Sequence, residues 1–163
     1  MAINNKETGL AEAMSHVTSG ATVMMGEFVG AGEPLTCVDY LAGQPVDGLT
    51  LITNTAGLPG GFGKAALFRS GQVRRLIGSH VGTTTESTAR YLEDSLIVQE
   101  FFPMGTWAEK VRAGAVGLGG ILVPVGVGIL DEPGLFEHLD KPKRTVELAG
   151  EIYLLEPPLT ADV

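Results

Sequence analysis

Cysteine is almost absent from this 163-residue sequence, in which Cys37 is the single example. One thiol cannot build an internal disulfide framework or a cysteine-rich zinc site, and we expect no metal site and a reducing, cytoplasmic location. Basic residues are also few, since 11 Lys and Arg face 19 Asp and Glu for a net charge of −8. This balance argues against binding to nucleic acid or to an anionic membrane surface, because both need a basic face.

Long apolar runs that could cross a membrane are scarce too. The uncharged stretch 113–130 barely reaches the length of a spanning helix, and it contains six glycines and Pro124. We interpret it as glycine-rich turns beside a buried strand. The first residues, 1–9, are polar and lack the apolar core of a signal peptide, which also favours the cytoplasm.

The composition indicates a single folded domain over 1–163. The hydrophobic share is 44% and the charged share only 18%, which is typical of a globular chain with a real core. Glycine is over-represented at 23 of 163 residues, about twice the roughly 7% average. So much glycine suggests backbone that bends sharply or comes close to a ligand.

Strand and helix patterns alternate along the chain. This predicts an α/β fold, a mostly parallel open sheet with flanking helices. Ligands of such sheets bind at the carboxyl ends of the strands. Glycine-rich loops lie at 26–32, 57–63 and 114–120, and we expect the site where the first and third converge. Strands are expected at 22–25, 49–53, 73–79, 96–101 and 121–123, helices at 8–18, 33–43, 64–70, 84–92 and 105–113, and a hairpin over 144–155 that turns at Gly150.

The segment 26–34, Gly-Glu-Phe-Val-Gly-Ala-Gly-Glu-Pro, has the most distinctive pattern. It joins a strand to a helix, where backbone N–H groups and the helix N-terminus favour a pyrophosphate, a carboxylate or a thioester oxyanion. It is neither the dinucleotide-binding G-x-G-x-x-G pattern nor a P-loop. From the residues alone, a simple tight turn that leads into the helix is equally acceptable.

In combination with other blocks, this segment resembles the alpha subunit of the family I 3-oxoacid CoA-transferases. The similar blocks occur in the family's order and cover nearly all of residues 8–163. They are the pattern Gly26-x-Phe28-x-Gly30-x-Gly32-x-Pro34, the strand and Asn at 49–54, the basic strand at 73–82, the helix entry at 103–106 with 108–114, the turn Pro124-x-Gly126-x-Gly128 and the segment 156–162.

The resemblance implies a CoA-transferase fold and a reaction that moves coenzyme A between carboxylic acids. In the family a glutamate forms a glutamyl-CoA thioester by covalent catalysis, and that glutamate belongs to the beta subunit. We therefore expect no catalytic residue in this chain, a beta-subunit partner in an α2β2 assembly, and acyl-CoA with short carboxylic acids as substrates. Coenzyme A would be a substrate, with no permanently bound cofactor.

The same resemblance assigns residues to the walls of the site. Position 104 would face the nucleophile, and Asn54 would help to hold the carboxylic substrate. The expected CoA-binding residues are Gly26, Glu27, Phe28, Val29, Gly30, Ala31 and Gly32, and the expected substrate wall is Asn54, Met104, Gly105, Gly114 and Gly117.

Three positions depart from the family pattern. Glu27 replaces the second Gly of Gly-Gly-Phe, Thr55 replaces the second residue of Asn-Asn or Asn-Asp, and Met104 replaces the Gln of Pro-Gln-Gly-Thr. Each touches the expected site, so a diverged CoA-thioester or C–C bond hydrolase and a non-catalytic CoA-binding or scaffold subunit remain alternatives. Family alpha subunits also continue beyond Asp162, so we expect that the C-terminal part is missing here or that a partner completes the sheet, and that Val163 begins another strand.

Other polar residues have two interpretations each. Glu27 is expected to be a polar loop residue or a substrate gate, and alternatively a nucleophile or base whose pKa is raised by partial burial. His80 ends a strand and is either a packing residue or a site residue. Cys37 is expected to be buried and structural. The basic cluster Arg69, Arg74 and Arg75 could meet CoA phosphates or form a solvated edge.

Overall fold

The computed structural model, which describes residues 7–58, 60–134 and 143–163, is built on a parallel sheet. Its four strands lie in the order β1-β2-β3-β4, and every neighbouring pair is parallel. This confirms the α/β fold with a parallel sheet. The strands are β1 (Thr22–Met25), β2 (Leu49–Thr53), β3 (Val73–Gly78) and β4 (Ile97–Phe101).

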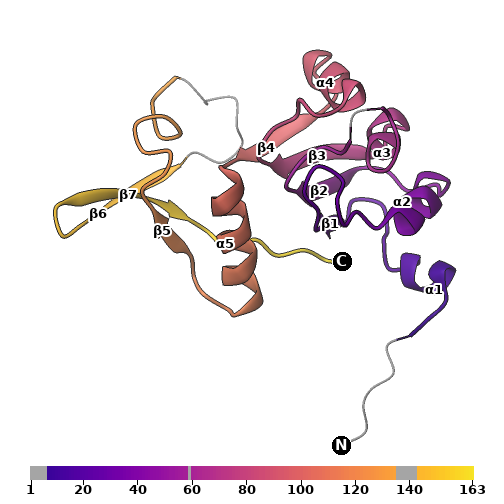
Figure 1. Ribbon diagram of the computed structural model, residues 1–163, viewed down its shortest axis with the longest axis horizontal. Helices are drawn as coiled ribbons and strands as arrows, with labels where there is room; N and C mark the ends of the chain where they lie inside the picture. Colours follow the sequence, from indigo (N-terminus) through magenta and orange to yellow (C-terminus); the bar gives the residue numbers. More distant parts are fainter. Residues whose placement is uncertain (1–6, 59, 135–142) are drawn as a thin grey trace, which may run out of the picture.

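Helices cover both faces of this sheet (Figure 1). One face carries α1 (Leu10–Met14), α2 (Leu35–Ala42), α3 (Ala65–Arg69) and α4 (Thr85–Leu92), while α5 (Met104–Ala115) lies against the other. Because successive side chains of a strand point to opposite faces, β1, β2 and β3 each contribute to two hydrophobic clusters.

Adjacent residues of the same strand belong to different clusters. Leu51 and Leu76 pack in the larger cluster under α1–α4, whereas Ile52 and Ile77 pack toward α5 with the half-buried Trp107. Strand β2 is buried along its whole length, which explains its nearly continuous apolar sequence. This division determines which face each site residue occupies.

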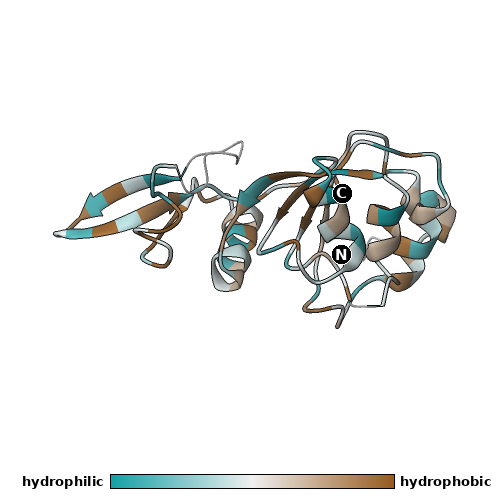
Figure 2. Cartoon of the chain, turned by 90° about the horizontal axis from the view of Figure 1, so that it is seen from above, coloured by the Kyte–Doolittle hydropathy of each residue, from teal (hydrophilic) through white to brown (hydrophobic). Residues whose placement is uncertain are grey.

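A second, antiparallel sheet stands to one side of the parallel one (Figure 2). Its order is β5-β7-β6, from β5 (Ile121–Val123), β6 (Arg144–Leu148) and β7 (Glu151–Glu156). The turn between β6 and β7 places Ala149 at φ 55° and Gly150 at φ 83°, and two such values are required by a two-residue type I′ hairpin. The hairpin expected around Gly150 is therefore confirmed, and the strand at 121–123 is found in this smaller sheet.

The C-terminal residues return to the free edge of β1. The Met24 N–H donates to the Val163 carbonyl at 2.9 Å, and the Asp162 N–H donates to the Thr22 carbonyl at 2.9 Å. The Asp162 carboxylate also accepts from the Thr22 N–H at 2.8 Å. The Val163 N–H also donates to the Thr22 carbonyl at 3.3 Å, so that Val163 bonds to Thr22 and Met24 in the pattern of a parallel pair.

Four buried charges fasten the smaller sheet to α5 and β4. Lys110 Nζ lies 2.7 Å from Glu100 and 2.7 Å from Glu156, and Lys143 Nζ lies 3.1 Å and 2.7 Å from the same carboxylates. Both ammonium groups also lie over the ring of Phe102, Lys110 at 4.7 Å from its centroid. Two cations and two anions in alternation leave no net charge in the interior.

The ionisation of Glu100 depends on this arrangement. Burial alone would raise the pKa of its carboxyl, but the charges of Lys143 and Lys110 outweigh burial and hold the pKa below its ordinary value of 4.5. A lowered folded-state pKa contributes stability above the ordinary value, and this stability is lost as the pH falls through the lowered one. The four buried charges therefore stabilise the fold at neutral pH, and this contribution is lost in acid.

Replacement of Lys110 by alanine should be strongly destabilising. The Lys110→Ala variant leaves two buried carboxylates with a single cation, and breaking a buried pair in this way costs about 3–5 kcal/mol. Arg112→Ala is the matched control on the same helix, because its pair with Glu109 is more than half exposed and is worth about 0.2–1 kcal/mol. Urea unfolding measures both, and similar losses for the two variants would contradict this account.

Candidate functional site

A largely apolar cavity of about 580 Å³ opens at the carboxyl ends of β3 and β4. Ser79 and His80 line it directly after β3, residues 101–104 line it from the end of β4 into α5, and the turn residues Val125, Gly126, Ile129 and Leu130 cover it. Parallel α/β sheets bind their ligands at this edge, as the sequence analysis expected.

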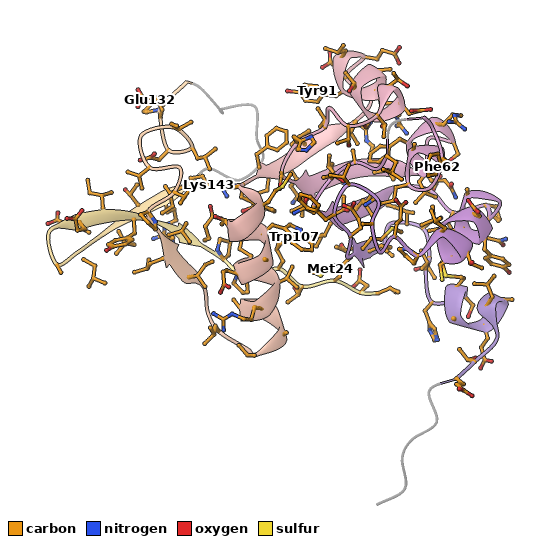
Figure 3. The ribbon with its side chains drawn as sticks, in the orientation of Figure 1. Met24, Phe62, Tyr91, Trp107, Glu132 and Lys143 are labelled. Carbon is orange, nitrogen blue, oxygen red and sulfur yellow. The ribbon has the colours of Figure 1, made fainter. Side chains whose placement is uncertain are left out.

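Among the described residues six buried polar side-chain atoms have no hydrogen-bond partner, and three of them lie at the same end of the sheet. They are Asn54 Oδ1 after β2, Ser79 Oγ after β3 and Trp107 Nε1 in the second turn of α5. Strand alternation places Asn54 with Ile52, and Ser79 with Ile77, on the face that packs against α5. Figure 3 shows Trp107 between α5 and the sheet. Unsatisfied buried groups are costly, so their gathering on one face indicates a place for a polar ligand.

The expected glycine-rich segment 26–32 forms a very small hairpin after β1. Phe28 and Ala31 exchange two backbone hydrogen bonds of 3.1 and 3.0 Å across Val29 and Gly30. Both turn residues have positive φ, 47° and 83°, which is the type I′ geometry that glycine makes accessible. The tight turn is therefore confirmed, and its tip presents Phe28, which is 60% exposed.

Glu27 lies in the loop after β1, as expected of a polar loop residue, but its side chain is buried beneath the hairpin, which corrects the expectations of a substrate gate and of a raised pKa. Its carboxylate accepts from the N–H groups of Gly30 at 2.7 Å and Thr55 at 2.9 Å, and lies 2.9 Å from Lys64 Nζ. Burial raises the pKa of Glu27, but the hydrogen bonds from Gly30, Lys64 and Thr55 outweigh it and lower the pKa. An ionised side chain with no exposed surface and several donors is poorly suited to act as a nucleophile or base.

Lys64 is the residue that sequence reasoning missed. Its side chain has no exposed surface, and its Nζ also donates to Thr53 Oγ1 at 2.8 Å. Burial lowers the pKa of Lys64, while Glu27 acts against that shift. Its backbone N–H donates to Glu33, a buried carboxyl whose pKa is raised by burial. A signal existed, since Lys64 is the one charged residue in the glycine-rich, apolar segment 57–68.

The expected wall residues separate into two groups. Met104 begins α5 and lines the cavity, Gly105 follows it, and Asn54 lies at the same end of the sheet. Gly114 and Gly117 lie at the other end of α5, which at twelve residues is about 18 Å long.

Close packing explains Gly114 without a ligand, because an added Cβ would lie only 2.0 Å from the Leu159 carbonyl oxygen. The expected convergence of 114–120 with 26–32 is therefore wrong. A helix that follows a parallel strand runs back toward the strand's beginning, and the turn 124–130 covers the cavity instead.

The remaining candidates take different positions. His80 lines the cavity, which favours the site interpretation. Cys37 is partly exposed in α2, so the buried role expected for it is wrong. Arg69 pairs with Glu86 at 2.6 Å with its own side chain half exposed, and Arg74 is exposed on β3. Over the described ranges, no group of three or more His, Cys, Asp and Glu side chains could hold a metal ion, and no helix is long and apolar enough to cross a membrane.

Sequence comparison extends the resemblance to curated proteins. The family model for coenzyme A transferases matches residues 8–163. The chain is 36% identical over 162 residues to the acetoacetyl-CoA:acetate/butyrate CoA transferase alpha subunit of Clostridium acetobutylicum, and covers 69% of it with 99% of its own length. It is 40% identical over 155 residues to the acetate CoA-transferase subunit alpha of Escherichia coli, with 94% of this chain covering 66% of that subunit. The chain thus spans about two thirds of these relatives.

Solved structures show a similar fold. An apo acyl-CoA transferase from Escherichia coli O157:H7 superposes with a TM-score of 0.79 at 20% identity, over 99% of this chain and 34% of that one. The glutaconate coenzyme A-transferase from Acidaminococcus fermentans superposes with a TM-score of 0.72 at 20% identity, over 93% of this chain and 53% of that one. A variant of the decarboxylase AibA/AibB superposes with a TM-score of 0.71 at 23% identity, over 94% of this chain and 58% of that one. These likenesses show the fold, and the decarboxylase indicates that it hosts more than one chemistry.

Removal of the Ser79 hydroxyl should leave stability unchanged or raise it. Ser79 Oγ is buried without a partner, so Ser79→Ala removes an unsatisfied group whose burial costs about 1–3 kcal/mol. Ser87→Ala is the matched control, because the buried Ser87 Oγ donates to the Val81 carbonyl at 2.6 Å and its loss should cost about 1 kcal/mol. Equal destabilisation of the two variants in urea unfolding would show that Ser79 has a structural partner after all.

Proposed function

The chain belongs to the coenzyme A transferase family, and from this we propose that it is the alpha subunit of an enzyme that moves coenzyme A between a short acyl-CoA and a carboxylic or 3-oxo acid. The observation that carries the proposal is the group of unpartnered polar atoms at Asn54, Ser79 and Trp107, close to the sheet edge where the apolar cavity opens. A thioester needs both features, an apolar space for its acyl chain and polar groups for its carbonyl.

The reaction requires a nucleophilic carboxylate from a partner chain. That carboxylate attacks the acyl-CoA carbonyl, and the C–S bond breaks to give a mixed anhydride and the CoA thiolate. The thiolate then attacks the glutamyl carbon of the anhydride, which releases the first acid and leaves a glutamyl-CoA thioester on the partner. The second acid attacks this thioester and expels the thiolate, which then attacks the acyl carbon of the new anhydride to give the second acyl-CoA and the free glutamate. Among the described residues that line the cavity, His80 is the only titratable side chain, which supports the proposal that this chain supplies a wall of the site and the partner supplies the nucleophile.

The chain's own residues would bind and orient the substrate. The Ser79 hydroxyl and the Trp107 N–H can donate to a carbonyl oxygen as it becomes an oxyanion, and a preorganised donor of this kind is worth roughly 3–4 kcal/mol. The hairpin 26–32 would contact coenzyme A with its exposed tip, Phe28 and Val29. Met104 would close the cavity on the apolar part of the acid.

The cavity favours a monocarboxylic acid. Relatives of this chain are named for both kinds of substrate, acetate and butyrate in one case and succinyl-CoA with a 3-ketoacid in another. None of the described residues that line the cavity is Lys or Arg. A second carboxylate buried there would be unpaired, which costs several kcal/mol. We therefore place short aliphatic acids ahead of dicarboxylic acids.

A partner subunit also suits the surface of the chain. The smaller sheet and its flanking turns expose a group of large aliphatic side chains, and apolar surface of this kind is typical of protein–protein contacts. We propose a beta subunit as the partner, in an α2β2 assembly located in the cytoplasm, with no permanently bound cofactor. The exposed residues are Leu118, Leu122, Val125, Ile129, Leu148 and Ile152.

Transfer of label tests the activity directly. The chain and its partner subunit are incubated with butyryl-CoA and isotopically labelled acetate, and labelled acetyl-CoA is the expected product. The chain alone should give none, because the nucleophile lies on the partner. Free CoA without labelled acetyl-CoA would identify a hydrolase, and either that result or turnover by the isolated chain would contradict the proposal.

A panel of acceptor acids tests the substrate class. With butyryl-CoA as donor, kcat/KM for acetate or butyrate should exceed that for succinate by at least about 100-fold, because a difference of several kcal/mol corresponds to a factor of this size or larger. Valerate serves as the control, since it is longer than butyrate but carries a single carboxylate. Efficient use of succinate would show that a cation reaches the bound acid.

A further inference from the structure

Two of the three departures from the family pattern touch each other. Thr55 Oγ1 lies 2.9 Å from Oε1 and 3.0 Å from Oε2 of Glu27, and the Thr55 N–H donates to the same carboxylate at 2.9 Å. The third departure, Met104, lines the cavity at the start of α5, on the opposite face of the sheet from Lys64 and α3. The changes at 27 and 55 therefore form one local unit.

This unit neutralises a buried cation. Lys64 has no exposed side-chain surface, and its Nζ lies 2.9 Å from Glu27 Oε1 and 2.8 Å from Thr53 Oγ1. Glu33 contacts the backbone N–H of Lys64, and burial raises the pKa of that carboxyl, so Glu33 is the weaker candidate for the counter-charge. A buried ammonium group without an ionised partner is strongly destabilising. Glu27 provides the ionised carboxylate at Lys64 Nζ.

The same carboxylate fixes the hairpin. It accepts from the Gly30 N–H at 2.7 Å, inside the type I′ turn, and from the Thr55 N–H just beyond β2. The hairpin is thus tied to β2 from below, while Phe28 at its tip is 60% exposed. The position of the tip depends on a group that no ligand can reach.

We propose that Glu27 is a positioning residue for the CoA-binding hairpin and that positions 27 and 55 are coupled, so that only one of them can carry the carboxylate facing Lys64. The inference rests on the proposed function for the identity of the ligand. A carboxylate at 55 would extend beyond the present Thr55 hydroxyl into the space of the Glu27 carboxylate, which a glycine at that position would leave open.

The coupling predicts a reversal of sign between two backgrounds. In the presence of Glu27, Thr55→Asp adds a second carboxylate against a single ammonium and should be harmful, because like charges at this distance repel. In the Glu27→Gly background, the same change restores the counter-charge of Lys64 and should be beneficial. Such a reversal is not expected from two independent structural positions.

Kinetics of the complex with its partner subunit test the proposal. Glu27→Gly and Thr55→Asp should each raise KM for the acyl-CoA at least about 10-fold with kcat changed less than about threefold, since loss of binding geometry appears in KM. The double variant Glu27→Gly/Thr55→Asp should return KM to within about threefold of the parent. Glu86→Gly is the control for removal of a carboxylate, because Glu86 on α4 pairs with the exposed Arg69 of α3 and its loss should leave KM unchanged.

Hydrogen exchange separates failure of the inference from failure of the proposed function. Amides of 26–32 should exchange faster in Glu27→Gly than in the parent, and protection should return in the double variant Glu27→Gly/Thr55→Asp. A further variant, Glu27→Gln, keeps the shape of the side chain but loses its charge, and it should also exchange faster than the parent. If the parent complex does not act on acyl-CoA, the proposed function fails while exchange still tests the tie to Lys64. An unchanged KM in Glu27→Gly, or a double variant no better than either single variant in KM and in exchange, would overturn the coupling.

Discussion

A buried ammonium group must have an ionised partner, and this requirement organises the ligand-binding end of the sheet. Lys64 lies without exposed surface between the end of β2 and the start of α3, where hydration is lost and the counter-charge must come from the protein. Glu27 meets this need from the loop after β1, and in doing so it binds the turn at Gly30 and the backbone at Thr55. One ion pair thus connects the ends of two strands and fixes the hairpin at 26–32.

The two faces of the sheet have different tasks at this edge. On the face of α1–α4 both oxygens of the Glu27 carboxylate are hydrogen-bonded, to Gly30, Thr55 and Lys64, which makes a rigid support. On the face of α5, Asn54, Ser79 and Trp107 keep buried atoms without partners. A binding site needs polar groups that are held in place and are still free to contact a ligand. The hydrogen bonds of Glu27 hold the adjacent layer of the sheet in place for this purpose. The four buried charges around Lys110 give similar support to the smaller sheet.

The sequence predicted the regular elements well, because their signals are local. Alternation and apolar runs located β1 and β2 to the residue, and glycine at 150 located the hairpin turn. The ion pair of Glu27 was missed because its partner, Lys64, is 37 positions away and the contact exists only after β1 and β2 pair. The placement of 114–120 was missed although the direction of a helix after a parallel strand implies it.

The three departures from the family pattern differ in what they imply for the reaction, because they lie on different faces of the sheet. Glu27 and Thr55 lie in the supporting layer, where their contact with each other and with Lys64 accounts for both changes without any effect on the reacting groups. Met104 alone lies on the substrate side, where it adds apolar surface to a cavity that is already apolar. Two of the three changes are therefore no argument against transferase chemistry, and the third acts on which acid fits. All three positions are therefore compatible with a retained transferase reaction, and only Met104 lies where it could alter the choice of acid.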